Sequence, residues 1–223
     1  IYMKNKIYSI IPLNVFMQYH TLDLPNHIKN NINLLKKKNP EFIFNLYDNE
    51  MCKTFLSKYF DKKVLYAYNL LNPEEYKSNL WRYCILYIYG GIYIDIKFSC
   101  INEFKLINLT DKEYFVRDID NINFKGVYNG LICCFPYNNI IYKCIKQIIE
   151  NVVNNLYGIS PLSITGSILL ESFFQKNEVS NFELYLFKDE HNNIYINNGN
   201  KHILKQYKIK KNNNQFMVLY VRL

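Results

Sequence analysis

Residues Ser78–Lys97 read SNLWRYCILYIYGGIYIDIK, and this stretch is more informative than any other part of the chain. A largely apolar run with a single charged side chain, Arg82, predicts a helix that packs against a core. The Gly-Gly pair at 90–91 ends this helix, and a short strand follows that leads to Asp95 and Lys97. A charge inside a buried helix is costly unless another group pairs with it. The stretch therefore predicts a polar partner for Arg82 and two charged side chains just past a strand.

The rest of the chain alternates between helical and strand patterns, which predicts an α/β domain with a mainly parallel, Rossmann-like central sheet and flanking helices. Ligands of such sheets bind outside the carboxyl ends of the strands, where Asp95 lies. We expect one domain over residues 1–223, in which the part from 171 to 223 is β-rich. Helices are predicted near 24–35, 52–59, 64–71, 72–89, 138–156 and 163–174, and strands near 7–19, 42–46, 93–94, 113–116 and 131–135.

Composition narrows the class of protein. The 223 residues are 49% hydrophobic and 21% charged, which is ordinary for a globular domain. The net charge of +8 comes from scattered lysines without a nucleic-acid-binding motif, so we expect anionic phosphate on a small molecule and no nucleic acid. No run approaches the roughly 20 apolar residues of a membrane span. Six cysteines without metal-site spacing predict reduced thiols and a cytoplasmic protein, or a Golgi-lumenal one if an anchor preceded Ile1.

Polar residues of the quoted stretch are spaced to meet at one ligand. Ser78 and Asn79 lie four and three residues before Arg82, on roughly one face of the predicted helix. Asp95 returns towards that face after the glycine turn. We expect Asn79, Arg82, Asp95 and Lys97 to surround a polar ligand. A simpler interpretation is an Arg82–Asp95 ion pair that fastens helix to strand and binds nothing.

The same stretch resembles the signature S-D-x-x-R-x-x-x-L-x-x-x-G-G-x-Y-x-D-x-D of DXD-containing glycosyltransferases of family 32 and their relatives. Further segments are similar to family motifs over about residues 11–170. These are IPLNVFMQYHTLDLP, NPEFIFNLYD, VYNGLICCFPYNNII and TGSILL.

The resemblance implies a GT-A fold that binds a nucleotide sugar, with a UDP- or GDP-hexose as the donor. It implies that Asp95 holds the sugar and ribose and helps to bind Mn²⁺ or Mg²⁺. It also implies retention of anomeric configuration. Arg82 and Asn79 would grip sugar hydroxyls, and Tyr93 would contact the donor. Tyr19 would lie by the base, and Ser78, Asn129 and Gly130 would complete the donor site.

Two residues depart from the family pattern. Asn79 replaces an Asp, and Lys97 replaces the second Asp of the DXD motif. An ammonium group cannot ligate a divalent cation and repels one nearby. Asp95 could bind a metal together with another ligand such as Asn129. Alternatively, Lys97 could replace the metal beside the diphosphate, or the protein could retain only binding.

The expected function is hexosyl transfer from a nucleotide diphosphate sugar to a glycan or protein acceptor, carried by Asp95, Arg82 and Lys97. The alternatives are a non-catalytic nucleotide-sugar or glycan-binding protein of the same fold and a basic nucleic-acid-binding domain. Other candidate features have simpler explanations. These are His191 and His202 as surface residues, Cys133 and Cys134 as core thiols, and Asp118 and Asp120 as part of a loop.

Overall fold

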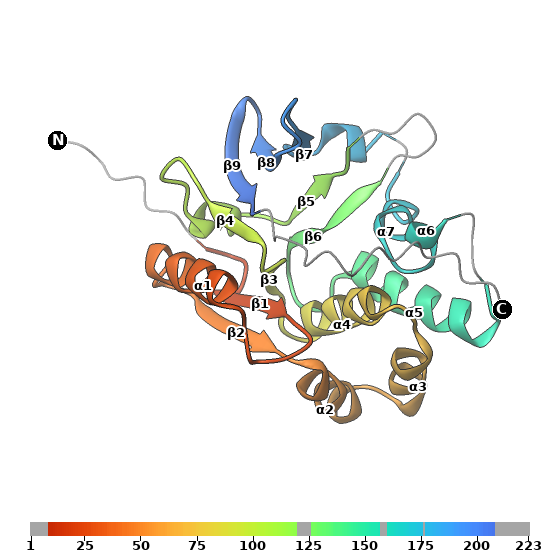
Figure 1. Ribbon diagram of the computed structural model, residues 1–223. Helices are drawn as coiled ribbons and strands as arrows, with labels where there is room; N and C mark the ends of the chain where they lie inside the picture. The colour runs from red at the N-terminus through yellow and green to blue at the C-terminus, as the bar shows by residue number, and fades with distance from the viewer. Residues whose placement is uncertain (1–8, 120–125, 157–159, 176, 208–223) are drawn as a thin grey trace.

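The computed structural model describes residues 9–119, 126–156, 160–175 and 177–207. Helices and strands alternate through its first half, and strands dominate its last part (Figure 1). The strands are β1 (Asn14–Gln18), β2 (Ile43–Tyr47), β3 (Gly91–Ile94), β4 (Phe98–Cys100), β5 (Tyr114–Arg117), β6 (Val127–Cys134), β7 (Leu184–Lys188), β8 (Ile194–Asn198) and β9 (Lys201–Gln206). The helices are α1 (Asn26–Lys38), α2 (Asn49–Tyr59), α3 (Lys62–Leu70), α4 (Glu74–Tyr89), α5 (Asn139–Val153), α6 (Pro161–Ile164) and α7 (Ser167–Glu171), with 3-10 turns at Leu106–Leu109 and Val179–Asn181.

The described strands form a nine-stranded sheet in the order β2-β1-β3-β6-β5-β7-β8-β9-β4. The expected α/β class is confirmed, but the sheet is mixed rather than mainly parallel. Among the described strands, β1–β2, β1–β3 and β5–β7 are parallel, and the other pairs are antiparallel. Parallel neighbours need a long crossover, which α1 supplies between β1 and β2. Short turns join β7, β8 and β9, so these neighbours run antiparallel.

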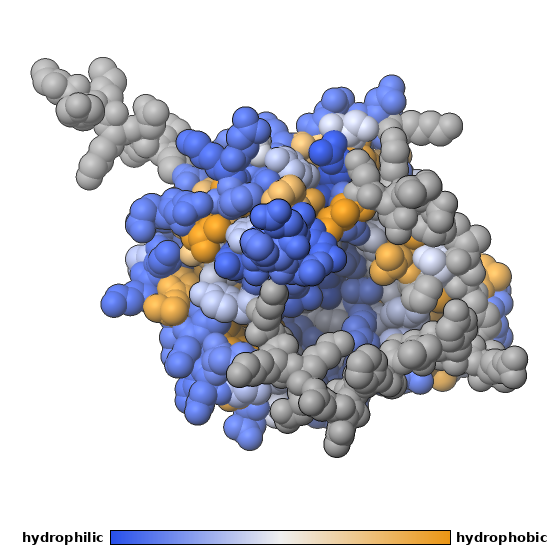
Figure 2. Space-filling model, turned by 45° about the horizontal axis from the view of Figure 1, so that its top comes forward, coloured by the Kyte–Doolittle hydropathy of each residue, from blue (hydrophilic) through white to orange (hydrophobic). Residues whose placement is uncertain are grey.

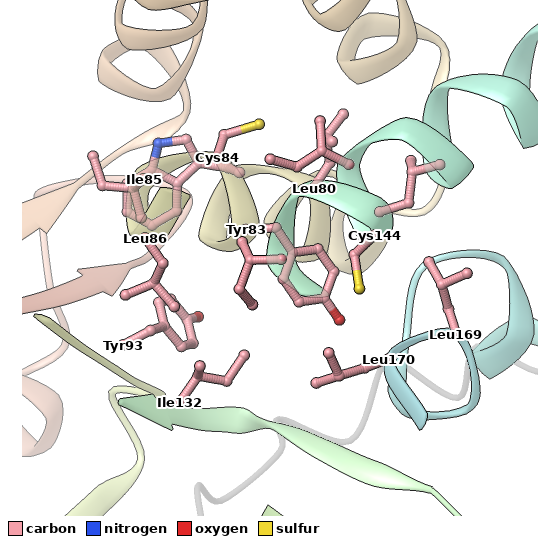
Figure 3. Packing of buried hydrophobic residues seen from close by; sticks show 14 of the residues in the cluster. Leu80, Tyr83, Cys84, Ile85, Leu86, Tyr93, Ile132, Cys144, Leu169 and Leu170 are labelled. Atoms are coloured by element: carbon pink, nitrogen blue, oxygen red, sulfur yellow. The ribbon is translucent and has the colours of Figure 1, made fainter. Parts of the chain in front are cut away.

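The sheet separates two apolar cores, because successive strand residues point to opposite faces. On one face, Phe16, Tyr93 and Ile132 pack against α2, α3, α4, α5 and α7. On the other, Val15 and Ile92 lie in one cluster with buried residues of α1, the helix that runs beside β1 in Figure 1. Figure 3 shows side chains of the first core from α4, α5 and α7, which gather above Tyr93 and Ile132 of the sheet. β3, which lies between β1 and β6, is therefore buried on both of its faces.

The Gly-Gly pair ends α4 as predicted, and it also sets the approach of β3 to β1. Gly90 and Gly91 have φ values of +60° and +99°, a region that glycine adopts at little cost. A Cβ on Gly91 would lie 2.6 Å from the carbonyl oxygen of Asn14. Only glycine therefore permits both the turn and the close packing of β3 beside β1.

Three predicted boundaries differ from the structure. The helix expected near 72–89 begins at Glu74, with Pro73 at its N-cap position. Asn138 caps α5 through its side chain, which accepts a hydrogen bond from the Ile141 amide at 3.0 Å. The helix expected near 163–174 is broken into α6 and α7, because Gly166 adopts a non-helical conformation between them. The β-rich end is confirmed up to β9, and the run at 216–220 lies outside the described residues.

Candidate donor site at the carboxyl edge of the sheet

Asp95 lies at the carboxyl edge of the parallel strands, directly after β3. Its amide donates a hydrogen bond to the carbonyl oxygen of Gly130 on β6 at 2.8 Å. The chain then turns, and the Phe98 amide closes the turn on the Asp95 carbonyl oxygen at 3.0 Å. The Tyr207 amide donates to the Lys97 carbonyl oxygen at 2.7 Å. The backbone that carries Asp95 and Lys97 is therefore fixed from two sides.

The Asp95 carboxylate contacts four side chains. Tyr93 and Tyr128 donate hydroxyl hydrogen bonds to Oδ1 and Oδ2, respectively, each at 3.1 Å. Nη2 of Arg82 lies 3.7 Å from Oδ1, and Nζ of Lys97 lies 3.8 Å from Oδ2. The side chains of Asp95 and Lys97 are 20% and 37% exposed. The solvent-facing part of this cluster is therefore a carboxylate next to an ammonium group.

The two tyrosines that contact Asp95 are held in their protonated form. Burial raises the pKa of Tyr128 well above its usual value, and the neighbouring Asp95 charge raises it further. Burial likewise raises the pKa of Tyr93. Because neither hydroxyl ionises at neutral pH, both remain hydrogen-bond donors to the carboxylate.

Arg82 reaches this cluster from α4, and its side chain is almost fully buried, with 7% exposed. Nη1 donates to the Asn129 carbonyl oxygen at 2.6 Å, and the guanidinium lies 4.4 Å from the centre of the Tyr93 ring. Burial lowers the pKa of Arg82, but the adjacent Tyr93 and the Asp95 carboxylate raise that pKa by more, so the group stays charged. Arg82 is thus a buried cation with several partners, and Asp95 is only one of them.

A network of amides and hydroxyls connects α4 to β6 and to the α6–α7 junction. Asn129 Nδ2 donates to Asn79 Oδ1 at 3.1 Å and to the Tyr83 hydroxyl at 3.3 Å. Asn79 Nδ2 donates to Thr165 Oγ1 at 3.0 Å, and the Tyr83 hydroxyl donates to the Thr165 carbonyl oxygen at 3.3 Å. Asn79 and Asn129 therefore lie next to each other. Their side-chain amides form hydrogen bonds with each other and with Thr165 and Tyr83.

β6 contains a bulge that turns two of its backbone carbonyl groups towards the site. Tyr114 pairs with Cys133, but Val116, two residues farther along β5, pairs with Tyr128, five residues earlier on β6. The extra residues include Asn129 and Gly130, whose carbonyl oxygens bind Arg82 and the Asp95 amide. β-Bulges are frequent beside active sites because they redirect groups out of the regular ladder. A Cβ on Gly130 would lie 2.6 Å from Asp95 Oδ2, so the position needs glycine.

Ser78 and Tyr19 complete the predicted set. Ser78 Oγ donates to Gln18 Oε1 at 2.9 Å, and Gln18 Nε2 donates to Asn49 Oδ1 at 2.9 Å. Tyr19 follows β1 at the same edge of the sheet as Asp95, and its ring lies 4.1 Å from that of His20. The structure therefore places all the predicted residues at or near this edge.

Sequence reasoning missed Gln18, Tyr128 and Thr165. Tyr128 directly precedes the predicted pair Asn129-Gly130, and Gln18 directly precedes Tyr19. Their position next to predicted site residues was the signal that could have identified them. Thr165 lies in the TGSILL segment and joins the site only through tertiary contact.

The remaining candidates lie in other surroundings. The His202 ring lies 4.3 Å from that of Tyr195, and its Nδ1 is 2.6 Å from Asn197 Oδ1. Cys133 and Cys134 are buried in β6. Asp118 accepts a hydrogen bond from the Ile119 amide at 2.8 Å. Asp120 lies outside the described residues.

The described residues do not fit a divalent cation at Asp95. Mg²⁺ and Mn²⁺ prefer several oxygen ligands, and no group of three or more His, Cys, Asp or Glu side chains gathers anywhere in the described ranges. Both carboxylate oxygens of Asp95 already accept tyrosine hydroxyls. Lys97 lies beside Oδ2, and unit charges about 4 Å apart near a protein surface repel by about 4 kcal/mol.

The face shown in Figure 2 is mostly hydrophilic, carries apolar side chains only in small groups and is hollowed near its middle. Within the described residues, no helix has the length and apolar character needed to cross a membrane.

Comparison with known proteins finds similarity to glycosyltransferases over part of the chain. Residues 25–116 match the family described as glycosyltransferase sugar-binding region containing DXD motif. The mannosyl phosphorylinositol ceramide synthases SUR1 and CSH1 of Saccharomyces cerevisiae are each 29% identical to the chain. The matches cover 63% and 71% of this chain but only 35% and 40% of the yeast proteins.

A solved structure shows the fold. The PaToxG glycosyltransferase superposes with a TM-score of 0.55 at 17% sequence identity, over 72% of this chain and 67% of that chain. The chain spans well under half the length of the two yeast relatives. The chain therefore has a GT-A fold, and its residues 25–116 are similar to the glycosyltransferase sugar-binding region that contains a DXD motif.

Proposed function

We propose that the protein transfers a hexose from a nucleotide diphosphate sugar to a glycan or protein acceptor, with retention of anomeric configuration, within a single domain. The observation that carries this proposal is the solvent-facing pair of Asp95 and Lys97, which follows β3 and lies within the matched sugar-binding region. Ligands of open α/β sheets bind at this edge. Reduced, buried cysteines favour the cytoplasm as the compartment.

Each predicted residue receives a role that fits its exposure. Asp95 and Lys97 face solvent and contact the donor. Arg82 is buried and acts through the Asn129 carbonyl and the Asp95 carboxylate. Tyr93 orients Asp95 through its hydroxyl. The amide network and the neighbouring residues shape the wall of the donor site. This supporting set is Ser78, Asn79, Asn129, Gly130 and Tyr19.

The reaction breaks the bond between the anomeric carbon and the diphosphate oxygen, whose electron pair stays with the nucleoside diphosphate. A bond forms between the anomeric carbon and an acceptor oxygen, which loses its proton to the departing phosphate or to solvent. Negative charge therefore develops on the diphosphate, and a fixed cation beside it lowers the barrier. Lys97 is the exposed cation of the described cluster.

The names of the yeast relatives contain a mannosyl group and a phosphorylinositol ceramide. We therefore put GDP-mannose first among the donors, with UDP-glucose as the uridine counterpart.

A donor-hydrolysis assay tests the proposal. The purified chain is incubated with GDP- and UDP-hexoses, with and without Mn²⁺, and release of GDP or UDP is measured. We expect release with at least one donor and a loss of about 100-fold in Asp95→Ala, because that variant removes the central anion of the cluster. The Glu183→Ala variant is the control, because its partner Lys112 is exposed and belongs to a different part of the sheet. Absence of both turnover and donor binding would refute the assignment.

The second candidate is a nucleotide-sugar or glycan-binding protein without activity, which the replacement of the second DXD aspartate by Lys97 favours. It predicts donor binding by calorimetry without turnover, even in the Asn79→Asp/Lys97→Asp double variant. Turnover by the unmodified chain would exclude this candidate.

A further inference from the structure

We propose that this chain binds the donor diphosphate without a divalent cation, because Lys97 supplies the positive charge and Asp95 positions the Lys97 ammonium instead of ligating a metal. The inference rests on the proposed function and concerns the same site. In the DXD pattern the first carboxylate helps to bind a metal ion, whereas here the same carboxylate would hold a lysine side chain.

The hydrogen bonds of Asp95 support this role. Its Oδ1 accepts the Tyr93 hydroxyl and faces Arg82, and its Oδ2 accepts the Tyr128 hydroxyl and faces Lys97. Both hydroxyls are buried donors whose raised pKa keeps them protonated. The carboxylate is therefore oriented by protein groups, in an arrangement that directs one oxygen towards the ammonium of Lys97.

The charge of the cluster selects an anion. Arg82 and Lys97 contribute two positive charges and Asp95 one negative charge, which leaves a net charge of +1 among these residues. The Arg82 guanidinium is buried behind the carboxylate, whereas the Lys97 side chain is 37% exposed. Lysine is an effective phosphate-binding point charge. A ligand that approaches from solvent thus meets a cation that a carboxylate holds in place.

The backbone of Lys97 is prepared for this function before any ligand arrives. Its carbonyl oxygen accepts the Tyr207 amide, and β4 begins at the next residue and pairs with β9. The preceding turn closes on the Asp95 carbonyl oxygen. A preorganised charge stabilises a developing anion without reorganisation during the reaction. In the proposed step, Lys97 therefore meets the electron pair that stays on the departing diphosphate.

Calorimetric titration of UDP and GDP into the protein in EDTA tests the inference. We expect at least one nucleotide to bind equally well in EDTA and in Mn²⁺. Lys97→Met should weaken that binding by about 10- to 100-fold, the range expected for one charged hydrogen bond, and Lys97→Arg should retain most of it. Lys112→Met is the matched control, because Lys112 is partly exposed and precedes β5, whose first residue pairs with β6 at Cys133, away from Asp95. It should bind like the unmodified protein.

A double-mutant cycle tests the positioning role of Asp95. If Asp95 acts through Lys97, the Asp95→Asn/Lys97→Met protein should bind nucleotide no worse than Lys97→Met alone. Additive losses would overturn the positioning role. Thermal unfolding of each variant confirms that the fold is kept.

The outcomes separate this inference from the proposed function. Nucleotide binding and turnover that vanish in EDTA and return with Mn²⁺ would overturn the inference and leave the transferase assignment intact. Binding in EDTA that is the same in Lys97→Met as in the unmodified protein would also overturn it. No binding in either buffer would overturn both proposals.

Discussion

Arg82 Nη1 donates a 2.6 Å hydrogen bond to the carbonyl oxygen of Asn129, which joins the middle of α4 to the bulge of β6. The ion pair with Asp95 is longer, at 3.7 Å. The buried guanidinium therefore fastens the bulge to the helix and balances the Asp95 charge at the same time. Both parts of the site depend on this one side chain.

The Arg82→Met variant should lower the free energy of unfolding by about 2–4 kcal/mol. It leaves a backbone carbonyl without its donor and a partly buried carboxylate without one of its cations. Urea unfolding at pH 7 measures the loss. Arg117→Met is the control, because Arg117 ends β5 and lies 5.5 Å from the Tyr185 ring. Its loss should stay below about 1 kcal/mol. Equal losses in the two variants would contradict the role given to Arg82.

Gly130→Ala should disturb both stability and nucleotide binding. The new methyl group would lie 2.6 Å from Asp95 Oδ2 and press against the Tyr128 hydroxyl. Overpacking of this kind costs about 1–3 kcal/mol, and here it displaces the carboxylate that faces Lys97. Chemical denaturation and calorimetry with UDP and GDP measure the two effects.

The control for Gly130 is Gly199→Ala. Gly199 has a φ of +54° and no atom within 4 Å of an added Cβ. Its loss should come from the backbone alone, at about 1 kcal/mol, with nucleotide affinity unchanged. If Gly130→Ala leaves affinity unchanged as well, the crowding at Asp95 has no part in binding.

Gln18→Met should destabilise the junction of β1 with α2 and α4. The amide of Gln18 binds Asn49 at the start of α2 and Ser78 on α4, and methionine can make neither hydrogen bond. Each bond contributes about 0.5–1.5 kcal/mol, so we expect a loss of roughly 1–2 kcal/mol in a denaturant titration. Thr54→Val removes only an exposed bond to the Glu50 carbonyl oxygen within α2, and it should change stability little. A similar loss of stability in Gln18→Met and Thr54→Val would argue against a stabilising role for the two Gln18 hydrogen bonds.

Stability should fall at alkaline pH through the buried thiols. Burial raises the pKa of Cys100 from 9.0 to about 11. Between these values, the unfolded chain releases a thiol proton that the folded chain keeps. The stabilising contribution is therefore complete below pH 9 and is lost as pH rises towards 11, with a total of roughly 2–3 kcal/mol. Guanidinium unfolding at pH 8, 9.5 and 10.5 follows the decline.

Cys100→Ala provides the matching control for the alkaline series. Without this thiol, the free energy of unfolding should fall less steeply over the same pH range. Identical slopes for the variant and the unmodified protein would show that Cys100 does not contribute.

The sequence by itself determined the local elements that carry the site. The apolar run around Arg82, the Gly-Gly pair and the strand before Asp95 act through helix propensity, positive φ and burial, which depend on near neighbours. The spacing of Arg82 and Asp95 was therefore sufficient to predict that these two side chains lie close together. The family pattern added the fold, because its motifs extend well beyond this stretch.

Tertiary structure alone decided how these groups are used. The sequence predicted a mainly parallel sheet, but the direction of β5 to β9 depends on which distant strands pair. The bulge of β6 depends on its register with β5, and the approach of Lys97 to Asp95 depends on β9 reaching β4. Tyr128 enters the site for the same reason. Long-range pairing has no local sequence signal because it results from packing the whole sheet, whereas each helix and turn follows from its own residues.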